Sequence, residues 1–389
     1  MNPVPVVRVN HKAANRVRSG HLWLFASDIL DSGSAAPGDA VTVLDPQSRV
    51  LGTAHFSSTS QIRLRLLSDR VEAIDEAWLR TRIERAHAYR RSVVGNSAAY
   101  RLVHAEGDLL PGLIVDRYGD FLAVQILDQG MDRLTPTIIS VLSSLLVPKG
   151  ILARDDAPAR AKEGLAREVR VLAGEIPDDV AVEMNGLSWH VDLKGGQKTG
   201  IFLDQRENYL AAREYARGRA LDCFTGTGGF ALHVAQRCDS VDAVDSSGPS
   251  TTTARKNAAA NGITNVAFHE ANVFDYLPGV ISAGRKFNTI VIDPPAFAKS
   301  RSAVEPAARG YKEVNLRALR LLEAGGILVT CSCSHHMSEA QLLELIASAA
   351  LDCGKRLRVI ERRTQARDHP ILLTVPETHY LKCLVFEAL

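Results

Sequence analysis

Cysteine is scarce in this chain, and none occurs before residue 223. Six cysteines are scattered through the C-terminal half of 389 residues, which is not the pattern of a small secreted domain held by disulfides. In a reducing cytosol they would remain free thiols, and the buried ones would pack as small hydrophobic residues.

The chain also lacks long apolar runs and a strong excess of either charge. No segment approaches the ~18 apolar residues of a membrane-spanning helix, and the N-terminal "MNPVPVVRVN" has no apolar core of a secretory signal. We therefore expect a soluble, cytoplasmic protein with no membrane partner. The formal net charge is only +2, so any nucleic-acid surface must be a local patch. A hydrophobic content of 46% suffices for more than one domain.

Residues 1–72 contain short β-like runs, "VVRV", "AVTVLD" and "QIRLRLL", separated by turn-forming residues. The last run alternates, so Arg63 and Arg65 share one face. Up to Arg70 this region has eight Lys and Arg against five Asp and no Glu. Such an excess is typical of a solvated β surface or of a surface that contacts phosphates.

Residues 73–186 begin with a helical pattern, "IDEAWLRTRIERAHAYRRSV", and continue with a β-hairpin that turns at Tyr118–Gly119–Asp120, which predicts an α+β domain. From residue 187 to 389 strands alternate with helices. The candidate strands are "RALDCF", "SVDAVD", "VAFHEA", "FNTIVID", "GGILVTCSC", "RLRVIERR" and "YLKCLVFEA". This alternation is typical of a parallel, doubly wound α/β sheet, whose ligands bind beyond the carboxyl ends of the strands.

The first three of these strands end in residues suited to a nucleoside. "LDCFTGTGGFAL" follows the first strand, and its Gly226 and Gly228 would let backbone N–H groups approach a ligand closely. The second strand ends at Asp245, where a carboxylate can bind ribose, and the third leads to Asn272, which can meet a base edge. The pattern predicts a nucleoside cofactor. The alternative is a glycine turn followed by a helix-capping aspartate.

The fourth strand runs into "TIVIDPPAFAKS". Asp293 followed by two prolines makes a rigid, projecting loop, which can present polar groups to a planar ligand. This favours an enzyme that methylates a planar nitrogenous substrate over one that uses NAD. The alternative is a proline-rich turn without a role in binding.

The fifth strand ends in "TCSCSHH", which could be a metal site, a redox pair or a reactive thiol. Zinc sites usually combine ligands from separate turns, so we expect no metal here, and a disulfide between Cys331 and Cys333 would be strained. A nucleophilic thiol explains more, because a thiolate is accessible near neutral pH. We expect Cys331 to be a core thiol, and Ser338 and Gln341 to form a capping box.

Several long motifs in this order resemble the bacterial S-adenosylmethionine-dependent 23S ribosomal RNA cytosine-5 methyltransferases that carry a PUA domain. They are "GHLWLFAS", "SSTSQIRLRLL", "YRLVHAEGDLLPGLIVDRYGDFLAVQ", "GGQKTGIFLDQREN", "FTGTGGF", "DPPAFAKS", "RGYKEVN", "TCSCSHHMS" and "DHPILLTVPETHYLK". The resemblance implies a PUA RNA-binding domain over 1–72, a central α+β domain over 73–186 and a methyltransferase domain over 187–389. The last would be a Rossmann-like class I fold with a mostly parallel seven-stranded sheet.

The resemblance also implies a set of residues that hold S-adenosylmethionine. They are Arg206, Phe224, Thr225, Gly226, Gly228, Asp245, Asn272 and Asp293. Asp245 would bind the ribose, Asn272 would face the adenine, and Arg206 would close over the cofactor. The family often has an aromatic residue in place of Gly226 and Asp in place of Asn272, although Asn can still donate and accept at an adenine edge.

Two catalytic residues follow from the same resemblance. Cys333 would be the nucleophile that adds to C6 of cytosine, which makes C5 enamine-like. Asp293 would bind the amide edge of the base and support proton uptake at N3. A related branch of enzymes has a second cysteine where this chain has Ala296, and Cys331 is a speculative substitute for it.

The implied partner is ribosomal RNA of the large subunit, contacted in part by Arg63 and Arg65, and a homodimer is compatible with the sequence. Two other functions stay open. One is methylation of a base nitrogen, which needs no thiol at Cys333. The other is an RNA-binding ribosome-assembly factor with a decayed cofactor pocket, against which the intact Asp245 and Asp293 argue.

Overall fold

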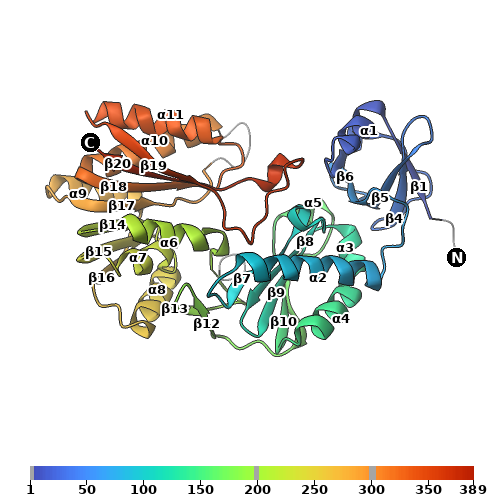
Figure 1. The fold of residues 1–389 in the computed structure, drawn as a ribbon, viewed down its shortest axis with the longest axis horizontal. Helices are drawn as coiled ribbons and strands as arrows, with labels where there is room; N and C mark the ends of the chain where they lie inside the picture. The colour runs from blue at the N-terminus through green and yellow to red at the C-terminus, as the bar shows by residue number, and fades with distance from the viewer. Residues whose placement is uncertain (1–3, 197–200, 298–303) are drawn as a thin grey trace. The chain divides into compact units, whose positions relative to one another are not determined.

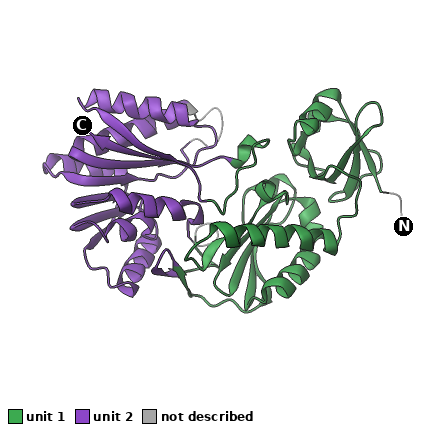
Figure 2. Cartoon of the chain, viewed as in Figure 1, with its two compact units in different colours: residues 1–183, 191–200, 367–378 green, residues 184–190, 201–366, 379–389 purple. Residues whose placement is uncertain are grey.

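The computed structural model describes residues 4–196, 201–297 and 304–389. Parts of the motifs "GGQKTG" and "DPPAFAKS" lie outside the described residues. The chain forms two compact units (Figure 2), each made of several stretches of sequence. Unit 1 comprises residues 1–183, 191–200 and 367–378, and unit 2 comprises residues 184–190, 201–366 and 379–389.

The N-terminal part of unit 1 is a six-stranded sheet, as the β-rich pattern of residues 1–72 predicts. Its strands lie in the order β2-β6-β5-β4-β1-β3. The bounds are β1 Val6–Val9, β2 Trp23–Phe25, β3 Ile29–Asp31, β4 Ala40–Leu44, β5 Val50–Phe56 and β6 Ile62–Ser68. Helix α1 (His11–Arg18) starts where the side chain of Asn10 accepts a hydrogen bond from Ala13 N. Apolar side chains of these elements, such as Val9 and Leu64, form a buried core.

A second sheet of unit 1 has the strand order β11-β10-β9-β8-β7. Its strands are β7 Ala99–His104, β8 Leu113–Tyr118, β9 Phe121–Ile126, β10 Gly150–Arg154 and β11 Val169–Gly174, and its helices are α2 Glu76–Val93, α3 Gln129–Arg133, α4 Thr135–Leu146 and α5 Ala159–Lys162. The predicted hairpin is present, since Tyr118 pairs with Phe121 and Gly119 has a φ of 59°. The predicted helix is α2, which buries Trp78 and Ile83 in the core of this domain.

Unit 2 contains the predicted doubly wound sheet, with the strand order β16-β15-β14-β17-β18-β20-β19. The strands are β14 Arg219–Cys223, β15 Ser240–Asp245, β16 Val266–Glu270, β17 Phe287–Ile292, β18 Leu322–Ser332, β19 Leu357–Arg363 and β20 Lys382–Ala388. Strand β20 is antiparallel to both of its neighbours, β18 and β19, and the other pairs are parallel. Both faces are covered by helices, which explains why the strands read as continuous apolar runs.

The helices of unit 2 lie in two groups on the two faces of this sheet (Figure 1). On one face are α6 Arg206–Tyr215, α7 Gly229–Val234 and α8 Gly248–Ala260, and on the other are α9 Val273–Ser282, α10 Val304–Leu321 and α11 Glu339–Asp352. The core between the sheet and the second group contains Tyr311, Leu328 and Ile346. This arrangement brings the carboxyl ends of the parallel strands to one edge of unit 2.

The path of the chain between the units was not predicted. Strands β12 (Val180–Met184) and β13 (Leu187–Val191) form a hairpin, and the expected boundary at residue 187 falls within it. Between β19 and β20, residues 367–378 leave unit 2 and belong to unit 1. Strand and helix patterns carry no information about such an excursion, because its contacts are with residues distant in sequence.

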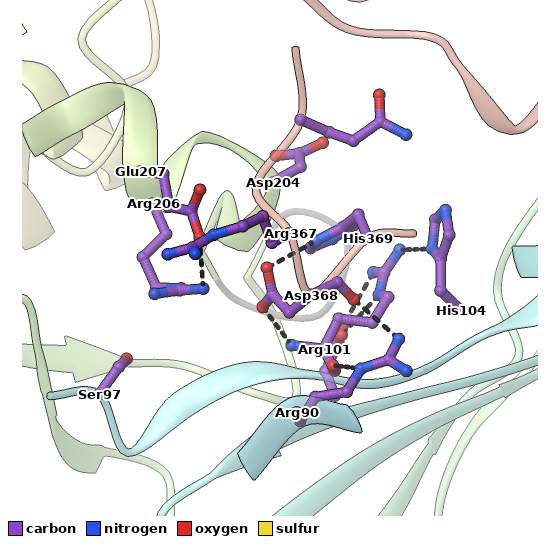
Figure 3. Close-up of polar contacts among 12 residues, drawn as sticks. Arg90, Ser97, Arg101, His104, Asp204, Arg206, Glu207, Arg367, Asp368 and His369 are labelled. Carbon is purple, nitrogen blue, oxygen red and sulfur yellow. Dashed lines mark hydrogen bonds and ion pairs between the residues drawn. The ribbon is translucent and has the colours of Figure 1, made fainter. Parts of the chain in front are cut away.

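Asp368 anchors this excursion within unit 1 (Figure 3). The backbone N–H of Arg101 donates to Asp368 Oδ2 at 2.9 Å, and Arg90 Nη2 donates to Asp368 O at 2.8 Å. Arg90 is fully buried, and its guanidinium also forms an ion pair with Asp108. Since a buried charge is costly without partners, these bonds specify one position for the segment within unit 1.

We expect the substitution Arg90→Met to destabilise unit 1 by about 3–5 kcal/mol, because it leaves the buried carboxylate of Asp108 without its partner. Arg85→Met is the matched control, since Arg85 is exposed on the same helix, and it should change stability by less than about 0.5 kcal/mol. The measurement is urea unfolding followed by circular dichroism. Equal midpoints for the two variants would contradict this role of Arg90.

Candidate functional site

The turn after β14 is built from left-handed backbone conformations. Phe224, Gly226 and Gly228 have φ angles of 66°, 55° and 93°. Glycine adopts this region readily, whereas phenylalanine does so at a cost. The N–H groups of Phe224 and Thr225 both donate to Val244 O, at 2.9 and 3.0 Å, and these bonds hold the turn against the end of β15.

Asp245 lies beside this turn at the end of β15, as the sequence predicts. Its Oδ2 accepts a hydrogen bond from Gly226 N at 2.9 Å, and its Oδ1 accepts one from Ser247 N at 2.9 Å. The two backbone bonds fix the orientation of the carboxylate. Because each carboxylate oxygen has a further lone pair, the group can still accept from ribose hydroxyls.

Asn272 follows β16, the next strand of the same edge, and is exposed. Its Oδ1 accepts a hydrogen bond from Phe274 N at 2.8 Å and caps α9. The capping bond fixes the orientation of this amide, and its Nδ2 group can donate to a base edge. An adenine ring nitrogen, which accepts a hydrogen bond, matches that donor.

Asp222 belongs to this site although the sequence interpretation omitted it. It is fully buried, and Thr225 Oγ1 donates to its Oδ2 at 2.6 Å. Its Oδ1 has no hydrogen-bond donor among the described residues. Burial raises the pKa of Asp222 to about 7, and the nearby carboxylates of Asp293 and Asp245 contribute to the same shift. A cationic ligand would stabilise this carboxylate.

The signal that could have identified Asp222 is its place near the end of β14, directly before the glycine turn.

Arg206, which the sequence assigns to the cofactor, is the first residue of α6 and is 3% exposed. Its guanidinium lies 3.5 Å from Glu207 Oε1 (Figure 3), and its carbonyl accepts a hydrogen bond from Asn185 at 2.7 Å. Its contact with a cofactor remains a prediction.

Asp293 lies directly after β17 and is oriented by a chain of hydrogen bonds. Gln205 Nε2 donates to Asp293 Oδ2 at 3.0 Å, and Gln205 Oε1 accepts from Asn208 Nδ2 at 2.7 Å. Asn208 Oδ1 in turn accepts from Arg363 Nε at 3.0 Å. Because arginine only donates, the chain sets the direction of each amide, and Asp293 must accept. Gln205 was not identified from the sequence, although it stands in the motif "LDQREN".

Cys333 and Cys331 have different environments. Cys331 is fully buried in β18 opposite Cys383 of β20, and burial and the Cys383 thiol raise its pKa well above the ordinary value. This burial agrees with the interpretation of Cys331 as a core thiol. Cys333 follows the last residue of β18 and is half-buried. Since β17 and β18 are parallel, Cys333 lies at the same strand edge as Asp293.

The turn around Cys333 is held by one buried phenol. The hydroxyl of Tyr311 on α10 lies 2.9 Å from Ser332 Oγ and 2.9 Å from Ser334 Oγ, the residues on either side of Cys333. Its ring contacts Phe297 of the Asp-Pro-Pro loop, with 4.8 Å between ring centroids. Tyr311 therefore connects the loop of Asp293 with the turn of Cys333.

The histidines after Cys333 lead into α11. The predicted capping box is confirmed: Ser338 Oγ accepts from Gln341 N at 3.2 Å, and Gln341 Oε1 accepts from Ser338 N at 2.9 Å. The ring of His335 lies 5.5 Å from that of Tyr380. Within residues 4–196, 201–297 and 304–389, no group of three or more His, Cys, Asp or Glu is arranged to hold a metal ion.

The two arginines assigned to RNA have unequal access to solvent. Arg65 is 9% exposed and forms an ion pair of 2.8 Å with the buried Glu163, so the expected phosphate contact does not agree with its position. Arg63 is partly exposed, donates to Ser57 O at 2.7 Å and covers the ring of Phe56. Three further arginines of this domain are engaged in ion pairs, Arg16 with Asp28 and both Arg18 and Arg49 with Asp45.

Comparisons with known proteins agree with this arrangement. A family model described as PUA-like domain matches residues 7–69, and one described as S-adenosylmethionine-dependent methyltransferase matches residues 138–387. A protein of Shewanella denitrificans named ribosomal RNA large subunit methyltransferase I is 40% identical over 375 residues, which are 94% of each chain. No helix of the described residues is long and apolar enough to cross a membrane.

Two solved structures share the fold over nearly the whole chain. A SAM-dependent methyltransferase from Streptococcus mutans has a TM-score of 0.84 and 21% identity, covering 98% of this chain and 99% of its own. A methyltransferase complexed with SAH has a TM-score of 0.86 at 21% identity with the same coverage. The glycine turn, the fixed Asp245 and the buried carboxylate of Asp222 are compatible with S-adenosylmethionine, a nucleoside cofactor that carries a sulfonium cation.

We expect Asp245→Ala to weaken the binding of S-adenosylmethionine by about 1–3 kcal/mol, because ribose hydroxyls would lose their acceptor in a partly buried site. Isothermal titration calorimetry measures this change. The control is Asp275→Ala, which removes an exposed carboxylate in the first turn of α9 and should leave the affinity unchanged. Wild-type affinity in a folded Asp245→Ala variant would contradict the assignment.

Asp222 should make the binding of S-adenosylmethionine dependent on pH. Its pKa in the folded protein is raised to about 7, so below this pH the carboxyl is mostly protonated and must release a proton to favour a cation. Affinity should therefore rise by up to about tenfold between about pH 6 and 8. The affinity for S-adenosylmethionine is measured for the wild type and for Asp222→Asn at several pH values, and the difference between the two profiles is the contribution of Asp222. Parallel pH profiles of the two proteins would rule it out.

Proposed function

Because this chain belongs to the S-adenosylmethionine-dependent methyltransferases that carry a PUA-like domain, we propose that it methylates C5 of a cytosine in large-subunit ribosomal RNA. The RNA class comes from the names of its relatives. The observation that supports C5 chemistry is the position of a half-buried thiol, Cys333, at the same strand edge as the oriented carboxylate of Asp293.

The proposed reaction starts with Cys333, because C5 of cytosine is a poor nucleophile. The Cys333 thiolate forms a bond to C6, and the electron pair of the C5–C6 double bond moves through the ring toward N3. Asp293 accepts hydrogen bonds from the amide edge of the base and supports proton uptake at N3. Since Gln205 fixes Oδ2 of Asp293 as an acceptor, the carboxylate is held ready for donors on that edge.

When bound, S-adenosylmethionine would supply an electrophilic methyl group to the activated C5, and S-adenosylhomocysteine would be the leaving group. The proton taken up at N3 is released as the C4–N3 double bond re-forms. A base then removes the C5 proton, whose electron pair restores the C5–C6 double bond, and the C6–S bond breaks with its electron pair returning to sulfur as the thiolate. Cys331 is unsuited to this proton transfer, because it is fully buried and its pKa is raised. Ala296 has no group that could take the proton.

The remaining site residues would hold the cofactor around the end of β14. The carboxylate of Asp245 would accept hydrogen bonds from the ribose hydroxyls, and Nδ2 of Asn272 would donate one to an adenine ring nitrogen. Phe224, Thr225, Gly226 and Gly228 would form the turn under the cofactor, with Arg206 beside it. The carboxylate of Asp222 would stabilise the positive charge of the cofactor.

The substrate RNA would be captured partly by the N-terminal domain. Arg63 stays in this proposal because part of it is exposed, whereas Arg65 is engaged with Glu163. Contacts with phosphates release counterions, so RNA affinity would fall steeply with salt concentration.

A second candidate function is methylation of a base nitrogen. The Asp-Pro-Pro loop that carries Asp293 favours it, since a carboxylate at that place could equally bind an amino group of a base. This reaction needs no covalent adduct, so the half-buried thiol of Cys333 would have no role. The two functions therefore differ in what happens when Cys333 is removed.

We expect RNA with 5-fluorocytosine at the target position to trap a protein–RNA adduct that survives denaturant, because fluorine cannot leave C5 as a proton does. The adduct should form with the wild type and with Cys331→Ala, and not with Cys333→Ala. The variant Cys353→Ala is a matched control, since Cys353 is half-buried elsewhere in the same unit. Denaturing gel electrophoresis of labelled RNA measures the adduct.

Two outcomes would contradict the proposal. An adduct that persists in Cys333→Ala and vanishes in Cys331→Ala would exchange the roles of the two thiols. Measurable methylation without an adduct in any variant would favour methylation of a base nitrogen. Binding of S-adenosylmethionine by Cys333→Ala is the control that its fold is intact.

A further inference from the structure

Lys382 is a buried lysine next to the turn of Cys333. It is the first residue of β20, is 4% exposed, and lies opposite Ser332 of β18. Lysine is rarely buried unless its amine has partners. Lys382 is buried at the same edge of the sheet as Cys333, so its amine needs partners there.

Two carbonyl groups hold the amine of Lys382. Its Nζ donates to Ser334 O at 2.7 Å and to Tyr380 O at 2.9 Å. Ser334 directly follows Cys333 in the chain, so the first of these bonds ties the amine to the peptide next to the thiol. A protonated lysine has three N–H donors. The two carbonyls take two of them and hold the ammonium group beside the turn of Cys333.

The charge of Lys382 is coupled to that of Cys333. Burial lowers the pKa of Lys382 to about 8, and the negative charges of Cys333 and Glu339 oppose this shift. Glu339 is also paired with Arg362. Below about pH 8 the amine is therefore mostly an ammonium ion, and a positive charge near a thiol favours its thiolate.

Other titratable or charged side chains lie on the elements packed around Lys382. They are Tyr311 of α10, Glu339 of α11, Arg362 and Arg363 of β19, and His335 of the turn. Among these, Tyr311 is bonded to Ser332 and Ser334, and Arg363 to Asn208 and Glu361. The residues that act on Lys382 through charge are thus Cys333 and Glu339.

We propose that the buried ammonium group of Lys382 activates Cys333 by stabilising its thiolate. When the thiolate forms, the S–H bond breaks, its electron pair stays on sulfur, and the proton passes to water. The positive charge on Nζ, held beside this turn by Ser334 O, favours the negative charge on sulfur. The inference rests on the proposed role of Cys333 as nucleophile, and it makes Lys382 a positioning and activating residue that acts through that thiol.

The test is the rate at which iodoacetamide alkylates Cys333 in the full-length protein between about pH 6 and 9. Mass spectrometry of the Cys333 peptide gives this rate, and the half-buried Cys353 in the same samples is an internal reference. In K382M and K382Q the Cys333 rate at neutral pH should fall roughly tenfold, the effect of one unit of thiol pKa. K382R keeps a positive charge and should restore most of the rate.

Lys355 provides a matched control, because its Nζ also donates to a carbonyl of β18, Leu322 O at 2.7 Å, but at the other end of the strand. K355M should leave the Cys333 profile unchanged. An unchanged Cys333 profile in K382Q would overturn the inference, and so would equal slowing in K382Q and K382R. If K382M does not fold, the comparison of K382Q with K382R decides.

This experiment is independent of methylation. If Cys333→Ala still methylates RNA, the proposed reaction fails, whereas the alkylation profile still reports whether Lys382 activates the thiol. If Cys333→Ala is inactive and Cys333 of K382Q is alkylated at the wild-type rate, only the role of Lys382 fails.

Discussion

The parallel pairing of β17 with β18 determines where chemistry can occur in unit 2. Ile292 pairs with Thr330, so the chain leaves both strands at one edge, with Asp293 on one side and Cys333 on the other. The parallel pairing of β14 with β15 places the glycine turn beside Asp245 in the same way. A slip of one residue in either pairing would turn these side chains to the opposite face of the sheet.

Buried polar groups behind this edge keep its side chains in place. Gln205 orients Asp293 from the start of α6, Tyr311 holds two serines from α10, and Lys382 binds two carbonyls from β20. Each group would be costly to bury without its partners. The network thus gives the edge one preferred geometry, and the loss of a single member would leave several others unpaired.

The sequence predicts what depends on local pattern. The strands of unit 2, the glycine turn and the capping box at Ser338 are recognisable because alternation, turn residues and cap spacing lie within a few residues of each other. Asp245 and Asp293 stand out because the first ends an apolar strand and the second directly follows one. Their positions in the fold agree with the prediction, and their chemical roles remain proposals.

The rest could not be predicted, because it depends on contacts between distant parts of the chain. Gln205 and Asp293 are 88 positions apart, and Lys382 reaches Ser334 across 48 positions. Arg65 is another residue whose contact could not be predicted from the local sequence. Alternation predicts that Arg65 shares one face of β6 with Arg63, but only the fold reveals the Glu163 that forms an ion pair with Arg65.

The excursion of residues 367–378 into unit 1 has a consequence for the integrity of the chain. Strand β20, which completes the central part of the large sheet between β18 and β19, follows this excursion in sequence. No single cut can therefore release unit 2 with all of its strands and without a segment that packs in unit 1. An isolated unit 2 that kept β20 would still carry residues 367–378, and its Asp368 would lack the contacts with Arg90 and Arg101 that unit 1 supplies.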